Sequence, residues 1–312
     1  MRALLLILLA IGWLHNGFAQ DTTNTISNEN LKILQSNEDS IRYLGSQVLQ
    51  NRTKEVRIAS SDKLNQLLIA SLEVENSFDY SFDSILHVSI LYPGDSTFRI
   101  FTWQLYVAPN EYRYAGIIQK NTAQPELFAL SDLSASLFFP DNMTVSSSSW
   151  FGALYYNLKQ INTSSGVYYT LFGLDNNSMW VKRKIIDVLY FTEEGKPQFG
   201  SPIFHSISQQ KQVKTKHRVI LDYSAEGSIS CNYSDEYKMI IFDNLIPIGG
   251  SHEGQGVIQV SDGSYRGYKF DGEKWVFVEK VFNDFQEEAP RENAVLDKRK
   301  DGLFGPRRKR NK

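Results

Sequence analysis

Three carboxylates, Asp222, Glu226 and Asp243, lie near one another in the sequence and are the candidates for acid–base chemistry. Glycoside hydrolases use two Asp or Glu side chains that flank the scissile bond at a defined separation. Sequence spacing alone does not set that separation, and turns are rich in Asp because its side chain hydrogen-bonds the local backbone. We therefore expect solvent-facing carboxylates on strands and turns, with a polysaccharide-directed hydrolase as the alternative.

Histidines offer no metal site in this sequence. Four of them follow residue 19, namely His87, His205, His217 and His252. The pair His252-Glu253 begins like the zinc-protease helix motif, which needs a second histidine four residues after the first. Gly256 occupies that position, so the motif fails. The sequence predicts no metal and no cofactor.

Aromatic residues are the remaining candidates for binding. We consider Trp103, Tyr268 and Trp275 as ligand-facing, although most aromatic side chains in strands belong to the core. Asp271-Gly272 is typical of a two-residue hairpin turn, which would place Tyr268 opposite Trp275. The expected surface would stack sugars or line an apolar cavity.

The elements that must position these residues change in type along the chain. Apolar residues at helical spacing predict a helical hairpin over residues 29–75. Runs rich in Val, Ile, Phe, Tyr and Trp, separated by short turns, then predict about 12 strands. We expect strands at residues 85–92, 97–107, 111–119, 152–161, 166–174, 182–192, 217–224, 228–233, 237–246, 256–260, 264–270 and 274–282. The predicted fold is mainly β, an antiparallel meander over residues 76–290 that is curved or closed like a barrel, or propeller-like.

The N-terminus of the 312-residue chain predicts export. Residues 1–19 have the charge, short apolar run and small residues of a secretory signal peptide, with cleavage after Ala19. A flexible stretch, residues 20–28, follows, and we expect no transmembrane segment in the mature chain. Cys231 is the only cysteine, so we expect a buried thiol and no disulfide.

Basic residues are concentrated at the C-terminus. Of the 33 Lys and Arg residues, eight lie between residues 298 and 312, in a tail that we expect to be disordered from residue 291. The body is acidic, which argues against nucleic-acid binding. Such a basic tail is usually solvated. The alternative is that four consecutive residues, Arg307, Arg308, Lys309 and Arg310, bind anionic lipid headgroups or phosphate at an envelope surface.

Several stretches of the chain form a recognisable set: residues 98–103, 112–119, 183–189, 199–204, 221–226, 241–247 and 263–268. Together they resemble a family of uncharacterised exported proteins from Bacteroidota. The resemblance covers most of residues 78–305 and implies the periplasm or cell surface of a Gram-negative bacterium. It supplies no catalytic residue.

The leading expectation for function is an exported, non-enzymatic envelope protein that binds a partner or a ligand. Two alternatives remain open at this stage. One is the hydrolase with a carboxylate pair, and the other is a carrier of an apolar ligand inside a closed β-barrel.

Overall fold

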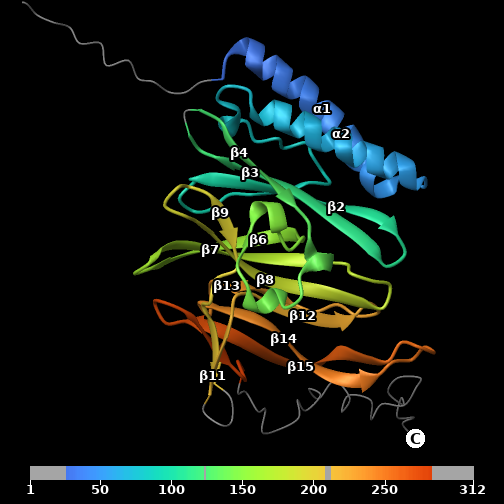
Figure 1. Ribbon diagram of the computed structural model, residues 1–312, viewed down its shortest axis with the longest axis vertical. Coiled ribbons are helices and arrows are strands. Elements are labelled where there is room, and N and C mark those ends of the chain that lie inside the picture. Colours follow the sequence, from blue (N-terminus) through green and yellow to red (C-terminus); the bar gives the residue numbers. More distant parts are fainter. Residues whose placement is uncertain (1–25, 123, 208–211, 283–312) are drawn as a thin grey trace, which may run out of the picture.

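The computed structural model describes residues 26–122, 124–207 and 212–282, which form four stacked layers. Figure 1 shows a pair of helices above three successive β-sheets, which we call the upper, middle and lower sheets. Three separate hydrophobic cores fill the spaces between neighbouring layers. The protein is thus mainly β, and its interior is divided into layers.

Helices α1 (Asn28–Gln50) and α2 (Lys54–Leu72) form the first layer, in the region predicted to be helical. The α1 helix begins at Ser27, whose side chain accepts a hydrogen bond from the backbone N–H of Asn30. Apolar side chains at helical spacing are buried against the upper sheet; they are Leu34, Ile41, Val48, Leu64, Leu68 and Leu72. Among the described residues, neither helix has both the length and the apolar character of a membrane span.

The upper sheet has the order β1 (Ser89–Leu91), β2 (Phe98–Ala108), β3 (Glu111–Lys120) and β4 (Glu126–Ser131). Its strands alternate between two buried faces. Phe101 and Trp103 of β2 point to the helices, and Phe98 and Ile100 point to the middle sheet. A single strand therefore contributes to two cores.

The middle sheet has the order β5 (Val145–Ser146), β9 (Pro197–Phe199), β8 (Val181–Phe191), β7 (Gly166–Asp175) and β6 (Leu154–Thr163), and β12 (Val219–Ser224) also pairs with β8. Ile185 of β8 faces the upper sheet, and Ile186 faces the lower sheet. Burial on both faces accounts for residues 185–191 of β8, which are apolar except for Asp187.

The lower sheet has the order β11 (Val213–Lys216), β10 (Phe204–Ile207), β16 (Trp275–Val278), β15 (Val257–Phe270), β14 (Met239–Gly249) and β13 (Cys231–Ser234). The neighbouring strands of this sheet pair antiparallel, except β10 with β16, which pair parallel. Short 3₁₀ turns lie outside the sheets: η1 (Ser77–Asp79), η2 (Ser134–Ser136), η3 (Pro140–Asn142) and η4 (Ser147–Ser149).

The predicted single meander of about 12 strands is wrong in its arrangement. The described residues contain 16 strands in three sheets, and no closed barrel is found among them. The physical reason is that strands such as β2 and β8 bury both faces, which requires stacked sheets. A barrel with an interior filled by side chains would bury only one face of each strand.

The hairpin of β15 and β16 also differs from its prediction. Phe270, and not Tyr268, lies opposite Trp275, because the turn contains four residues rather than two. The Asp271 carboxylate accepts hydrogen bonds from the backbone N–H groups of Glu273 and Lys274 at 3.0 and 2.9 Å, and this extended Asx turn replaces the tight one. The shift is two residues, so each side chain keeps its predicted face.

Candidate functional site

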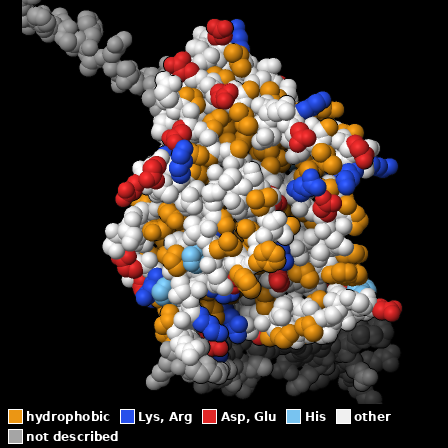
Figure 2. Space-filling view, viewed as in Figure 1, with side chains coloured by type: hydrophobic (Ala, Val, Ile, Leu, Met, Phe, Trp, Pro, Cys, Tyr) orange, Lys and Arg blue, Asp and Glu red, His pale blue; other side chains and the backbone are white. Residues whose placement is uncertain are grey.

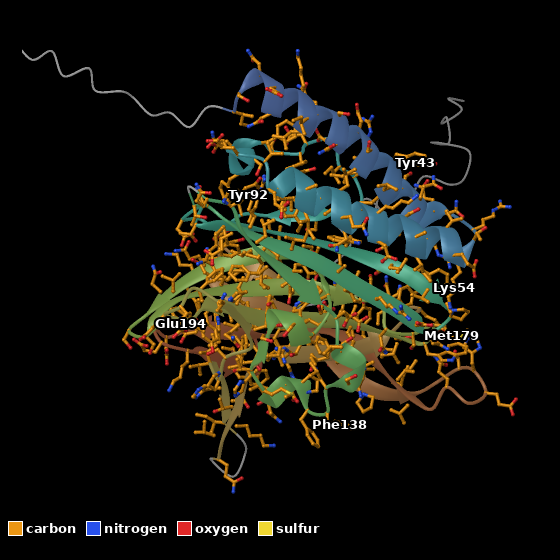
Figure 3. All side chains as sticks on the ribbon, turned by 45° about the horizontal axis from the view of Figure 1, so that its top comes forward. Tyr43, Lys54, Tyr92, Phe138, Met179 and Glu194 are labelled. Atoms are coloured by element: carbon orange, nitrogen blue, oxygen red, sulfur yellow. The ribbon has the colours of Figure 1, made fainter. Side chains whose placement is uncertain are left out.

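A cavity of about 350 Å³ lies where the helical layer, the upper sheet and the middle sheet meet. Its lining includes residues near the C-terminal ends of α1 and β7, which lie at the same edge of the protein. In Figure 3 this edge is marked by Lys54, which follows α1 in the chain, and by Met179, which follows β7. Most of its wall is apolar, formed by Val48, Leu49, Leu64, Leu86, Val88, Trp103, Leu154 and Leu174. A cavity of this size and character suits a small organic molecule.

Trp103 forms part of the inner wall and is held in place by its neighbours. Its position on β2 points the ring toward the helices, and only 1% of the residue is exposed. The indole N–H donates a hydrogen bond to the Ser61 hydroxyl of α2 at 3.2 Å. Because that donor is satisfied inside the protein, the ring presents only carbon atoms to the cavity.

Gly45 of α1 lines the cavity beside His87, which lies in the segment between α2 and β1. A Cβ atom added at this position would lie 3.4 Å from the Cβ of His87. An interior glycine lowers helix stability by about 1 kcal/mol relative to alanine. A longer side chain here would enter space that the cavity now occupies, because both Gly45 and His87 line it.

The other end of the cavity is polar but uncharged. The side-chain amide of Asn176 donates a hydrogen bond to Gln104 Oε1 at 2.6 Å, which joins the end of β7 to β2. His87 and Ser89 complete the polar part of the lining. The lining contains amide, hydroxyl and imidazole groups and no Lys, Arg, Asp or Glu side chain among the described residues. A neutral hydrogen-bonding group is therefore favoured there over a charged one.

A buried network behind this polar end fixes the two amides. The Tyr114 hydroxyl lies 3.1 Å from Asp175 Oδ1 and 3.3 Å from Gln104 Oε1, and it accepts a hydrogen bond from the Asn176 backbone N–H. Burial raises the pKa of Asp175, although the Asn177 backbone and the Arg183 guanidinium oppose the shift. Burial also raises the pKa of Tyr114. The network orients the amides, and Tyr114 and Asp175 do not themselves line the cavity.

The predicted aromatic candidates separate in the structure. Trp103 lines the cavity, whereas Tyr268 and Trp275 are core residues between the middle and lower sheets. Trp275 is fully buried, and its indole N–H donates to the Thr170 hydroxyl at 3.1 Å. Packing and hydrogen bonding therefore account for Trp275 without a ligand.

The three candidate carboxylates lie on different elements and have separate partners. Asp222 of β12 accepts a hydrogen bond from Arg183 at 2.8 Å. Asp243 of β14 accepts one from the Ser230 backbone and one from the Ser261 hydroxyl, both at 2.6 Å, across a β-bulge. Local structure thus accounts for both carboxylates, and neither lines the cavity.

Glu226 lies at a second, smaller hollow of about 270 Å³ between the turn after β12 and the β14–β15 hairpin. Its carboxylate is 2.8 Å from His252 Nε2, and both side chains are about half exposed. The His252 ring also lies against Trp180, with ring centroids 5.0 Å apart. These contacts hold the hairpin against the β12 turn.

The potential metal ligands are dispersed among the described residues, and the single cysteine is buried. Within residues 26–122, 124–207 and 212–282 there is no cluster of three His, Cys, Asp or Glu side chains placed to bind a metal. Cys231 is free and buried, as predicted, and burial raises the pKa of its thiol to about 12. Ala19 and the tail residues Arg307, Arg308, Lys309 and Arg310 lie outside the described residues.

Four further cavity residues, Leu86, His87, Gln104 and Asn176, were not predicted from the sequence. One sequence signal could have pointed to two of them. Leu86 and His87 lie just before β1, in the segment that follows the helices, and they place an apolar side chain next to an imidazole. Comparisons with protein-family models, with curated proteins and with solved structures find no match for the chain.

Proposed function

We propose that this protein is a non-enzymatic binding protein whose cavity takes a small, neutral and mainly apolar molecule. The observation that carries the proposal is the cavity beside Trp103, with hydrocarbon walls and an uncharged amide end. Ligand sites are typically concave and apolar, with a few polar groups that fix orientation. The three carboxylates, in contrast, are occupied by separate local contacts, so a carboxylate-pair hydrolase has no comparable support.

The proposal replaces the expected carrier inside a barrel with a site at the junction of layers. Spaces between the sheets are filled by packed side chains. The cavity instead lies at an edge, where α1, α2, β2, β6 and β7 contribute one or a few residues each. Since the described strands do not close a barrel, the ligand would enter from this edge.

A fluorescent titration tests the proposal with a matched pair of probes. N-phenyl-1-naphthylamine is neutral and apolar, and 8-anilinonaphthalene-1-sulfonate is a similar molecule with a negative charge. We expect the neutral probe to bind at least about tenfold more tightly, since burying an unpaired charge in an apolar site is costly. Equal binding of both probes would contradict a neutral site.

Two filling variants locate the binding. Gly45→Leu fills the cavity from α1, and Leu154→Trp fills it from β6, on a different wall. Each should weaken neutral-probe binding by at least about tenfold. Gly45→Ala is the matched control, because its added methyl group meets His87 only at contact distance and the helix is retained. Unchanged binding by both filling variants, with melting temperatures kept, would refute the cavity as the site.

Export to the periplasm or cell surface is a further part of the proposal, supported by the sequence of residues 1–19. N-terminal sequencing of the protein made in a Gram-negative host should begin at Gln20. A chain that still begins at Met1 would contradict cleavage after Ala19. Binding of an anionic surface by the basic tail likewise stays a proposal, tested by deleting residues 291–312 and measuring vesicle binding.

A further inference from the structure

Two adjacent phenylalanines protrude from the turn between η2 and η3, and neither lines the cavity. Phe138 is 86% exposed and Phe139 is 76% exposed, and they are among the most exposed large apolar residues described. Figure 3 shows Phe138 pointing outward from the body of the protein. The 3₁₀ turns of this segment lie in front of the sheets in Figure 1. We call residues 137–140 the diphenylalanine turn.

The diphenylalanine turn is tethered to the sheets, so its exposure does not come from a loose loop. The fully buried Arg218 donates hydrogen bonds to the backbone oxygens of Pro140 and Met143. The backbone N–H of His217 donates to the Asp141 oxygen at 2.7 Å. Leu137 packs against the core between the upper and middle sheets. A held turn presents both rings without an ordering cost on binding.

The charges beside the turn are positive or neutralised. Asp141 is the acidic residue that follows the two rings, and its carboxylate lies 3.0 Å from the Lys216 ammonium. Lys214 lies two residues before Lys216 on β11, so both side chains are on the same face of that strand. Figure 2 shows hydrophobic side chains in the middle of this view, with most charged side chains near its margins. With Asp141 neutralised by Lys216, the charge that remains beside the apolar tip is that of Lys214, which suits an anionic interface.

We propose that the diphenylalanine turn inserts into the interfacial region of an anionic lipid bilayer, with Lys214 facing the headgroups and the Lys216–Asp141 pair beside it. A protruding tip needs no matching pocket in a bilayer, because acyl chains and headgroups rearrange around aromatic rings. Phe, like Trp and Leu, is typical of the apolar side of segments that bury themselves at the headgroup–acyl boundary. A protein partner would instead need a concave acceptor shaped for both rings.

Vesicle co-sedimentation of the full mature chain tests this proposal. The probes are vesicles of phosphatidylcholine and vesicles of phosphatidylcholine with phosphatidylglycerol in equal parts. We expect binding to the anionic vesicles, and Phe138→Ser/Phe139→Ser should reduce the partition coefficient by at least about tenfold, since two large apolar contacts are lost. Lys214→Gln should weaken binding and reduce its sensitivity to salt. The basic tail is present in every variant, so its contribution cancels.

Two controls distinguish membrane insertion of the turn from nonspecific hydrophobic adsorption of the protein to vesicles. Tyr43→Ser and Val257→Ser remove exposed apolar side chains from α1 and β15, at 64% and 70% exposure, and should leave vesicle binding unchanged. A Phe139→Trp variant should show a blue shift of its emission on anionic vesicles and quenching by lipids brominated on the acyl chain. Circular dichroism melts establish that each variant is folded.

Two results would overturn the proposal. One is binding of the double phenylalanine variant that equals the parent protein, together with no lipid quenching of the tryptophan introduced by Phe139→Trp. The other is a dimer of the parent protein that the same double variant converts to a monomer, which would identify the turn as a contact between two copies.

Discussion

The Arg218 guanidinium lies 3.1 Å from Asp187 Oδ1, and both side chains are fully buried. Asp187 belongs to β8 of the middle sheet, and Arg218 immediately precedes β12, which pairs with β8. Tyr155 donates a further hydrogen bond to Asp187 at 3.3 Å, and burial raises the pKa of Asp187 although Arg218 opposes the shift. This ion pair thus joins the middle sheet to the diphenylalanine turn, which Arg218 also holds.

Removing Arg218 should strongly destabilise the fold. Arg218→Met leaves Asp187 as an uncompensated buried charge, and we expect a loss of about 3–5 kcal/mol in the free energy of unfolding, measured by urea denaturation. Arg113→Met is the control, because Arg113 pairs with Glu111 at 2.7 Å where both side chains are exposed, and the variant should lose about 1 kcal/mol or less from that pair. Similar losses for the two variants would contradict the importance of the buried pair.

Gly200 is required beside the same guanidinium. Its φ is +84°, and an added Cβ would lie 2.8 Å from Arg218 Nη2 and 2.7 Å from the Met143 backbone oxygen. Gly254→Ala provides a matched control with φ of +78° and nothing within 4 Å of the added atom. Both variants should lose about 1 kcal/mol from backbone strain, and Gly200→Ala should lose at least about 1 kcal/mol more from the steric clash. Equal losses of unfolding free energy for the two variants, measured by calorimetry, would show that a Cβ atom fits at position 200 without a clash.

Cys231 should be inert while the protein is folded. Burial raises its thiol pKa from 9.0 to about 12, so the thiolate fraction at pH 8 falls about a thousandfold. We expect Ellman's reagent to react with the native chain far more slowly than with the chain in 8 M urea. Rapid reaction of the folded protein with one equivalent of reagent would show that the thiol is accessible.

Buried tyrosines should make the protein sensitive to alkali. Burial raises the pKa of Tyr268 from 10.0 to about 12, so the folded state holds this proton more tightly than the unfolded state. The contribution is fully present below pH 10 and is lost as pH rises from 10 to 12. The urea concentration at the unfolding midpoint should fall between pH 10 and pH 12, and it should fall less steeply for Tyr268→Phe than for the parent protein. The substitution should change the midpoint at pH 8 little, and an unchanged slope would argue against burial of the phenol.

Most elements of this fold were predictable because their patterns are local. The α1 and α2 helices and the long strands β2, β3, β6, β7 and β14 all lie within a few residues of their predicted ranges. Strands β4, β5, β9, β10 and β11 were not predicted. Strands β5, β9, β10 and β11 have two to four residues each, too few alternating positions for a recognisable pattern. Strand β4 has six residues but only one that is buried, Leu130, so its alternation is weak.

The arrangement of the strands was harder to predict, because it depends on contacts between distant residues. A pair such as Phe98 and Tyr169, with ring centroids 4.8 Å apart, joins the upper and middle sheets and leaves no mark in local spacing. The cavity has the same origin: Gln104 and Asn176 lie 72 positions apart in the chain. Of its lining, only Trp103 was singled out from the sequence, because its residue type alone made it a candidate.

The most direct test of the neutral, apolar cavity is a crystal structure with a brominated derivative of N-phenyl-1-naphthylamine. Anomalous scattering from bromine would locate the bound molecule without reference to the protein atoms. We predict a peak between Trp103 and Leu154, with the amine of the probe directed toward Gln104 and Asn176. A probe that binds in solution but gives its peak elsewhere on the protein would contradict the proposed site.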